Sequence, residues 1–179
     1  MNGSPRVHGN SAIVSGMLSE SLQASPARVS VMRLHEMKIK PCTDCRSCKS
    51  GLLECITRDD MRWLSGALER SAYIIFVTPV YWFGPTSQTK LVIDRLRPYF
   101  LNGRLKGKPA TVITVAGEGY RDSTLVFSMF RRIFRTLGMI ESGMFALKGY
   151  DAGDVILNTS FRRVLRSCCI NINDGNFNR

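Results

Sequence analysis

Histidine is scarce in this sequence, the common glycine-rich nucleotide signatures are missing, and no apolar run is long. The two histidines, His8 and His35, are isolated, so no Ser-His-Asp arrangement is expected and hydrolase chemistry is not favoured. Neither Walker A spacing nor the three-glycine dinucleotide fingerprint is present. Met1 is followed by polar residues and no apolar run reaches the roughly 20 residues of a membrane span. We therefore expect no signal peptide, no membrane span and a cytoplasmic location.

Length and charge set further bounds. A chain of 179 residues fits one domain with an adequate core, here taken as residues 1–179. It carries 25 Lys plus Arg against 14 Asp plus Glu, a net charge of +11, which attracts anionic ligands, acidic proteins or nucleic acid. Because no recognised nucleic-acid-binding motif accompanies the basic residues, nucleic acid is not the expected partner.

Four of the six cysteines are concentrated in a short loop, at Cys42, Cys45, Cys48 and Cys55. In a reducing compartment such a cluster binds metal or performs redox chemistry more often than it forms structural disulfides. Three cysteines at successive intervals of three resemble the ferredoxin pattern more than the paired knuckles of a zinc site. The spacing favours an iron–sulfur cluster and leaves zinc, or a metal-free or disulfide form, open. The adjacent pair Cys168-Cys169 is interpreted as small buried apolar residues.

Strand-like and helix-like segments alternate along the chain. We predict strands over residues 27–34, 72–78, 110–116 and 144–147, and helices over 12–22, 61–70, 87–96, 124–137 and 154–165. In the helix over 124–137 we expect Leu125, Met129, Ile133 and Leu137 to face inward and Arg131, Arg132 and Arg135 to face outward. The alternation predicts an α/β protein with a doubly wound parallel sheet, whose ligands collect at the carboxyl ends of the strands.

Three loops occupy such strand ends and together suit a mononucleotide with a flat ring, best matched by FMN. The first loop offers a phosphate cradle before a helix, although an ordinary capped loop fits it equally; its candidates are Ser4, Arg6, Asn10 and Ser11. The second is aromatic and backbone-rich, although its aromatics could equally be core or surface residues: Pro79, Val80, Tyr81, Trp82, Phe83 and Gly84. The third has glycines that allow close backbone approach: Ala116, Gly117 and Gly119.

Several motifs carry a family resemblance. They are Gly3-Ser4-Pro5-Arg6 with Gly9-Asn10-Ser11, the cysteine run ending in Asp59-Asp60-Met61, and Pro79-Val80-Tyr81-Trp82 with Lys90 and Asp94-Arg95. From the first residue to about Asp154 the chain resembles the iron-sulfur flavoproteins, within the NADPH-dependent FMN reductase group of flavodoxin-like fold. The resemblance implies FMN on the three loops above and a [4Fe–4S] cluster on the four clustered cysteines.

The resemblance also implies partners and an arrangement of strands. It implies reduced ferredoxin or NAD(P)H as donor, a small-molecule acceptor, and a homodimer or homotetramer with cluster and flavin close across subunits. The implied strand order is 2-1-3-4-5, with the cysteine-rich insertion at about 38–58. Here few residues precede the Gly-Ser-Pro-Arg turn, so we expect the first strand to be stunted or truncated.

The combined expectation is an oxidoreductase in which FMN handles electron pairs, the cluster handles single electrons, and no amino acid acts as general acid or nucleophile. The positive charge suggests that the surface docks an acidic partner such as ferredoxin, or an anionic substrate. Two alternatives stay open: an NAD(P)H-dependent FMN or quinone reductase without a cluster, and a zinc-stabilised nucleic-acid-binding protein.

Overall fold

The structure is a computed structural model that describes residues 1–23, 28–51 and 53–173, with side chains described through Cys168. Seven α-helices are assigned in these ranges: α1 Asn10–Gln23, α2 Met61–Arg70, α3 Ser87–Asp94, α4 Pro98–Asn102, α5 Tyr120–Leu137, α6 Asp154–Leu157 and α7 Thr159–Asn173. Two short 3-10 helices precede α2, η1 Leu34–Glu36 and η2 Ser47–Lys49. The strands are β1 Ile74–Tyr81, β2 Gly84–Pro85, β3 Pro109–Ala116 and β4 Ile140–Lys148.

The strands form one sheet in the order β2-β1-β3-β4. β1, β3 and β4 are parallel, and the two-residue β2 returns antiparallel to the end of β1. Every residue of β3 is buried, as expected for a β-branched apolar run that is covered on both faces of a parallel sheet. The central strands β1 and β3 could be predicted from the sequence, because a short continuous apolar run is typical of a strand that is buried on both faces.

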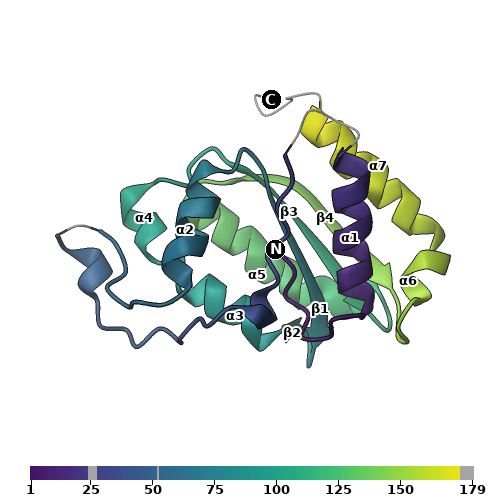
Figure 1. Cartoon of the computed structure of the whole chain (residues 1–179), viewed down its shortest axis with the longest axis horizontal. Helices are drawn as coiled ribbons and strands as arrows, with labels where there is room; N and C mark the ends of the chain where they lie inside the picture. Colours follow the sequence, from purple (N-terminus) through teal and green to yellow (C-terminus); the bar gives the residue numbers. More distant parts are fainter. Residues whose placement is uncertain (24–27, 52, 174–179) are drawn as a thin grey trace.

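Helices cover both faces of the sheet, with α1 and α7 on one side and α2, α4 and α5 on the other (Figure 1). On the α5 side, Phe76 packs against the rings of Phe130 and Phe134 at centroid distances of 4.9 and 6.0 Å. On the α1 side, strand residues of opposite parity such as Val77 and Ile113 form a second apolar cluster with the helices. Successive side chains of a strand therefore pack into the apolar clusters on opposite faces of the sheet. No helix within the described residues is long and apolar enough to cross a membrane.

The predicted strand over 27–34 is wrong for its described residues. Residues 28–32 are irregular, and Arg33 makes only an isolated parallel bridge with Asn2 before η1 begins. Asn2 also bridges Val77 of β1, so residues 1–3 lie between the two segments without forming a strand. Among the described residues the pairing here is limited to these isolated bridges, so no ladder of strand length forms. The predicted order 2-1-3-4-5 is therefore not confirmed by the assigned strands.

The helix predicted over 124–137 exists but begins earlier and faces differently. It starts at Tyr120, directly after Gly119, whose φ of +59° makes the turn out of β3. Leu125, expected inward, is 64% exposed. The buried stripe is instead Ser123, Val126, Phe127, Phe130, Phe134 and Leu137, with Met129 and Ile133 half-buried. The expected outward position of Arg131, Arg132 and Arg135 is confirmed.

The carboxyl-terminal elements also differ from the prediction. The last strand is nine residues long, because its pairing with β3 extends well beyond the apolar stretch 144–147. The helix predicted over 154–165 is two helices, α6 and α7, separated at Asn158, whose side chain caps Ser160 N–H at 2.9 Å. Cys168 is buried as predicted. The side chain of Cys169 and residues 174–179 lie outside the described part of the chain.

Candidate functional site

The predicted ligand loops meet at one edge of the sheet, because β1 and β3 are parallel and both end there (Figure 1). The loop of Ser4 starts beside β1, where Gly3 N–H donates to the carbonyl of Val77, in the middle of that strand, at 2.8 Å. A fourth loop, residues 149–153, follows β4 to the same edge. No site residue was predicted in this loop, although its Gly-Tyr-Asp-Ala-Gly composition after a strand is a turn signal.

The first loop contains an unsatisfied buried hydroxyl at the start of α1. Ser4 is buried, and its Oγ accepts the Arg6 N–H at 3.1 Å. Ser11 is also buried, but its Oγ has no hydrogen-bond partner among the described residues. Such a group costs about 1–3 kcal/mol unless a ligand satisfies it. A phosphate at the N-terminus of α1 would do so, and backbone N–H groups there favour the same charge.

The side chain of Asn10, which we predicted to contact the phosphate, forms hydrogen bonds with the fourth loop and the residues that follow it. Its side-chain NH₂ donates to the Asp151 carbonyl at 2.8 Å, and its Oδ1 accepts the N–H groups of Gly153 and Val155 at 2.8 and 3.4 Å. These bonds join segments more than 140 residues apart. Asn10 therefore positions the two loops relative to each other, and direct contact with a phosphate stays a prediction. Arg6, the other residue predicted at the phosphate, is exposed.

Three buried threonines, Thr78, Thr86 and Thr89, fix the first loop to α3. None of them was predicted from the sequence. Thr86 caps α3 and donates its hydroxyl to the Gly3 carbonyl at 2.6 Å. Its Oγ1 also contacts that of Thr89 at 3.0 Å, and Thr89 donates to Thr78 at 3.2 Å. A Cβ on Gly3 would clash with Thr89 Oγ1, which explains the glycine. A threonine just before a predicted helix was the available signal.

The aromatic loop is a tight hairpin between β1 and β2. Trp82 and Phe83 occupy its two central positions with φ of +48° and +62°, as a type I′ turn requires. Neither residue is one that favours this conformation, and such strain costs about 1–3 kcal/mol per residue. The turn leaves Trp82 96%, Phe83 58% and Tyr81 41% exposed. These aromatics are surface residues in this structure, available to a planar ligand, and their stacking on a ring stays a prediction.

The glycine loop after β3 lines an open hollow of about 630 Å³. Glu118 N–H donates to Asp122 Oδ2 at 2.9 Å, and Gly119 leads into α5. The opposite wall comes from the fourth loop and the start of α7, including Tyr150 and Ser160. The hollow includes Gly117 and Gly119 and extends toward β4, away from the aromatic hairpin.

The four clustered cysteines line one small hollow, together with Arg95 and Arg97. Cys42, Cys45 and Cys55 are exposed and Cys48 is half-buried, all as free thiols. Within the described residues, no three His, Cys, Asp or Glu side chains converge closely enough for a single metal ion. A zinc ion needs its thiolates about 2.3 Å from one point, whereas each cysteine of a [4Fe–4S] cluster binds a different iron.

Four cysteines are a donor set that suits either a [4Fe–4S] cluster or a structural zinc ion. The hollow itself measures about 20 Å³, roughly the space of one water molecule. A cluster would require the loop to spread. Asp44, Arg46 and Leu53 already have positive φ values, as does Gly51, so the loop backbone is tightly turned.

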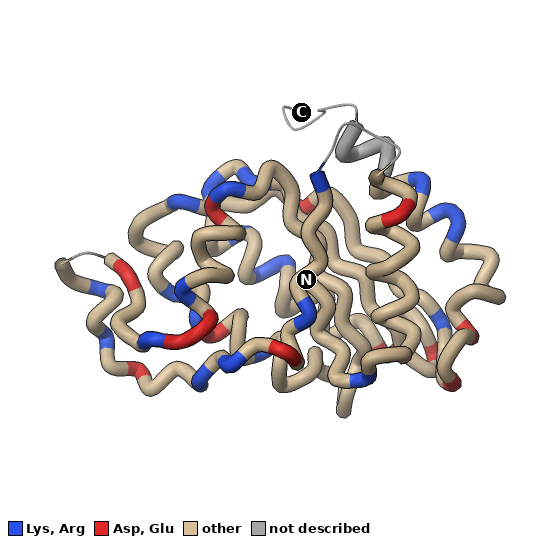
Figure 2. The backbone as a smooth tube through the Cα atoms, viewed as in Figure 1, with Lys and Arg blue, Asp and Glu red and all other residues tan. Residues whose placement is uncertain are grey.

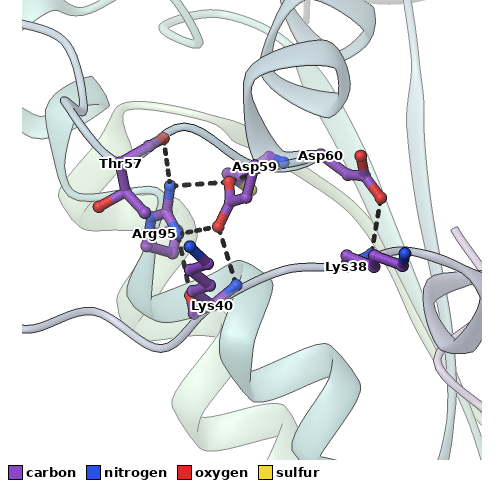
Figure 3. A network of polar contacts seen from close by, with 7 residues as sticks. Lys38, Lys40, Thr57, Asp59, Asp60 and Arg95 are labelled. Carbon is purple, nitrogen blue, oxygen red and sulfur yellow. Dashed lines mark hydrogen bonds and ion pairs between the residues drawn. The ribbon is translucent and has the colours of Figure 1, made fainter.

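A buried ion pair holds the two stems of the cysteine loop together (Figure 3). Arg95 binds Asp59 in bidentate fashion, with N–O distances of 2.7 and 3.1 Å and both side chains at most 2% exposed. Arg95 also donates to the carbonyls of Lys40 at 2.8 Å and Thr57 at 3.4 Å. Asp59 in turn accepts the Lys40 N–H at 2.8 Å. The next residue, Asp60, accepts the Lys38 N–H at 2.6 Å.

Hydrogen bonds and charge in this region shift the acidities of several groups. The N–H of Ser47, followed by its hydroxyl, lowers the pKa of Cys45 and so favours its thiolate. Burial alone would raise the pKa of Asp59, but hydrogen bonds from Arg95 and the Lys40 N–H lower it. Burial opposes the charge of Arg95, yet Asp59 and the Cys55 thiol raise its pKa. The guanidinium thus faces both a carboxylate and a candidate ligand.

Comparison with known proteins settles the family. Residues 1–150 match the family described as NADPH-dependent FMN reductase. The chain belongs to this family. An iron-sulfur flavoprotein of Archaeoglobus fulgidus is 32% identical over 154 residues, covering 86% of this chain and 69% of that protein. An iron-sulfur flavoprotein of Methanocaldococcus jannaschii is 24% identical over 143 residues, covering 80% and 74%.

A solved structure shares the fold of this FMN reductase family member. The NAD(P)H:quinone oxidoreductase from Methanothermobacter marburgensis superposes with a TM-score of 0.67 over 94% of this chain and 92% of that one, at 16% identity. The α/β fold with a mostly parallel sheet is therefore confirmed, and the chain is an FMN-linked oxidoreductase.

Proposed function

We propose that this protein passes electrons between a [4Fe–4S] cluster on Cys42, Cys45, Cys48 and Cys55 and an FMN at the carboxyl edge of the sheet. The observation that carries the proposal is that all four cysteines line one hollow in a chain of the FMN reductase family. Two relatives named iron-sulfur flavoprotein support the cluster. Electrons would pass from reduced ferredoxin or NAD(P)H, through these two centres, to a small-molecule acceptor.

In this proposal the bridged segments complete a flavodoxin-like sheet. Residues 1–3 lie beside β1 and residues 32–34 lie beside residues 1–3, so the spatial order 32–34, 1–3, β1, β3, β4 corresponds to 2-1-3-4-5 with two stunted members. This order aims the loops of Ser4, Tyr81 and Gly117 at a common ligand. Ser4 and Ser11 would hold the FMN phosphate, while the hairpin of Tyr81 and the Gly117 loop would flank the ring.

When bound, FMN supplies paired-electron chemistry and the cluster supplies single-electron chemistry. The chain contributes binding and orientation. Ser11 offers a buried hydroxyl, Thr86 fixes the backbone of the phosphate loop through Gly3, and the Asp59–Arg95 pair fixes the cysteine loop. No side chain is assigned a proton-transfer role.

The proposed partners follow from the surface of the cysteine loop. Residues 38–58 contain five Lys or Arg against two Asp or Glu, and Figure 2 shows basic residues along this loop and its stems. A positive surface around an electron-transfer centre suits an acidic ferredoxin. We extend the proposal to a homodimer or homotetramer in which the exposed cysteine loop of one subunit approaches the flavin of another.

A cluster-free reductase is the second candidate. Three of the four cysteines are exposed, and the structural relative from Methanothermobacter marburgensis is named as an NAD(P)H:quinone oxidoreductase. In that case the FMN site alone would carry activity. Membership in a reductase family argues against the other alternative, a zinc-stabilised nucleic-acid-binding protein.

One variant separates the two candidates. Replacing Cys42, Cys45, Cys48 and Cys55 together with Ser removes every proposed cluster ligand from a loop that contributes little to the core. We expect the variant to keep FMN but to lose ferredoxin-linked reduction of that FMN, measured anaerobically by absorbance. Full retention of NAD(P)H-driven and ferredoxin-driven activity would instead favour the cluster-free reductase.

A further inference from the structure

The short helix α3 joins the two candidate sites. At its start, the capping residue Thr86 holds the Gly3 carbonyl beside the predicted phosphate loop. At its end, Arg95 reaches the cysteine loop. Eight helical residues span about 12 Å. The chain thus fastens both loops to opposite ends of one rigid element.

Arg95 closes the cysteine loop at its base. Its carbonyl partners, Lys40 and Thr57, lie two residues before Cys42 and two residues after Cys55. The bidentate bond to Asp59 anchors the guanidinium, whose side chain is only 1% exposed. A planar fork with fixed donor directions can hold two backbone segments and a carboxylate at once, which an ammonium cannot do with the same geometry.

Arg95 also faces the hollow of the cysteines. It lines that hollow with all four of them, and its charge interacts with Cys55. Its buried Nε makes no hydrogen bond within the described part of the chain. A buried cationic donor left unpaired is costly, and an anionic thiolate-bound group would be a suitable acceptor.

We propose that Arg95 is the positioning residue of the cysteine loop: it closes the loop base through Lys40, Thr57 and Asp59 and holds positive charge against the group bound by the cysteines. The identity of that group rests on the proposed function. Loop closure does not, because it is defined by contacts present without any bound group.

Loop closure is tested on the metal-free protein with Arg95→Lys and Arg95→Gln. The cysteine loop contains trypsin sites after Arg46 and Lys49, both outside the clamp. Loss of bidentate, charge-assisted bonds should raise cleavage at these sites by about 10- to 100-fold under native conditions. Arg97→Gln is the control, because Arg97 lines the same hollow but is partly exposed and lies 3.7 Å from Asp44. Cleavage of both Arg95 variants at the wild-type rate would overturn the proposal.

A measurement on the unaltered protein covers the case in which the variants do not fold. The Lys40 N–H, bound to Asp59 inside the clamp, should exchange with solvent at least about tenfold more slowly than the N–H groups of residues 43–46 at the loop tip. Equal exchange at the base and the tip would contradict closure by Arg95.

The charge role is tested on anaerobically loaded protein. Arg95→Gln should release iron to a chelator several-fold faster and shift the midpoint potential to a more negative value. Arg95→Lys should also release iron faster but keep a potential near that of the wild type, since its charge remains. An unchanged potential in Arg95→Gln would overturn the charge role. Absence of iron in the wild-type protein would contradict the proposed function, while the proteolysis result would still decide loop closure.

Discussion

At the scale of single residues, Ser11 and Ser15 show how a hydrogen bond distinguishes two similar side chains. Both are buried on α1, one turn apart. Ser15 Oγ donates to the Ser11 carbonyl at 2.8 Å, whereas Ser11 Oγ has no partner among the residues that the structure describes. Of these two residues, only Ser11 has a hydroxyl left for a ligand at the helix N-terminus. It is therefore the residue that reports most directly on phosphate binding.

Ser11→Ala should weaken FMN binding by about 10- to 100-fold, because a hydrogen bond to a charged phosphate contributes about 1.5–3 kcal/mol. Stability without FMN should be unchanged or slightly higher, since an unsatisfied buried hydroxyl is removed. The dissociation constant can be measured by quenching of FMN fluorescence. Ser15→Ala is the matched control and should bind FMN normally. Equal affinity in both variants would show that Ser11 does not face the phosphate.

The buried pair of Asp59 and Arg95 gives a prediction with a defined pH dependence. The pKa of Asp59 is lowered in the folded state, so its ion pair stabilises the fold above the pKa of an unfolded aspartate, about 4. That contribution is lost as the pH falls through the lower, folded-state pKa. Asp59→Asn should cost about 3–5 kcal/mol at neutral pH, because Arg95 is left buried and uncompensated.

Urea unfolding across pH 3 to 7, read by circular dichroism, measures this cost; the span brackets the pKa of about 4. The difference between wild type and Asp59→Asn should shrink toward the acid end. Asp60→Asn is the neighbouring control, since Asp60 accepts one backbone N–H and has an exposed position. Its loss should stay near 1 kcal/mol. A difference for Asp59→Asn that did not depend on pH would contradict the ion-pair explanation.

At the scale of elements, Asn10 connects the start of α1 to the loop before α6. Its three hydrogen bonds reach Asp151, Gly153 and Val155. Two of these use the side-chain oxygen as acceptor, and one uses the NH₂ group as donor. The two loops at the sheet edge are thus held by one amide, which makes their relative position sensitive to this side chain.

Asn10→Ala should lower stability by about 1–3 kcal/mol, because buried partners lose their bonds. Asn10→Asp keeps an oxygen that can accept the N–H groups of Gly153 and Val155, so it should lose less stability than Asn10→Ala. Thermal unfolding of the FMN-free protein measures both changes. If Asn10→Ala unfolded like the wild type yet bound FMN poorly, Asn10 would be a phosphate ligand and not a connection between loops.

The elements also show what the sequence could and could not reveal. Continuous apolar runs predicted β1 and β3, and the close spacing of four cysteines predicted that they share one site. Both signals are local in the sequence, and the four cysteines do line one hollow. The single bridges of Asn2 and the partners of Asn10 and Arg95 depend on segments distant in sequence. Likewise, Leu125 fits the helical period, but the sheet selected the neighbouring stripe of Val126 and Phe130. Periodicity gives the spacing of a buried face and not always its phase.

At the scale of the whole molecule, basic residues lie on both sides of the sheet. The cysteine loop, which projects beside α2 and α4, is basic, and α7 on the other face also carries arginines (Figures 1 and 2). A net charge of +11 attracts acidic proteins from a distance, while loop residues decide where they dock. Raising the salt concentration and reversing a single loop charge should therefore slow electron transfer from ferredoxin in ways that can be measured separately.

Reduction by an acidic ferredoxin should slow at least several-fold when salt is raised from about 0.05 to 0.5 M, since the Debye length shortens. Lys49→Glu, in the exposed part of the loop, should slow it further at low salt. Arg163→Glu on α7 makes the same charge change elsewhere and should have a weaker effect. Stopped-flow absorbance under anaerobic conditions measures these rates. A rate indifferent to ionic strength would remove the docking proposal.

The central claim is that one chain holds a flavin and an iron–sulfur cluster. Its most direct test is anaerobic purification followed by analysis of FMN, iron, acid-labile sulfide and zinc on the same sample. We expect one FMN per chain, with about four iron and four sulfide that disappear in the quadruple Cys→Ser variant. Flavin without iron and sulfide in the anaerobic wild-type protein, or zinc in their place, would contradict it.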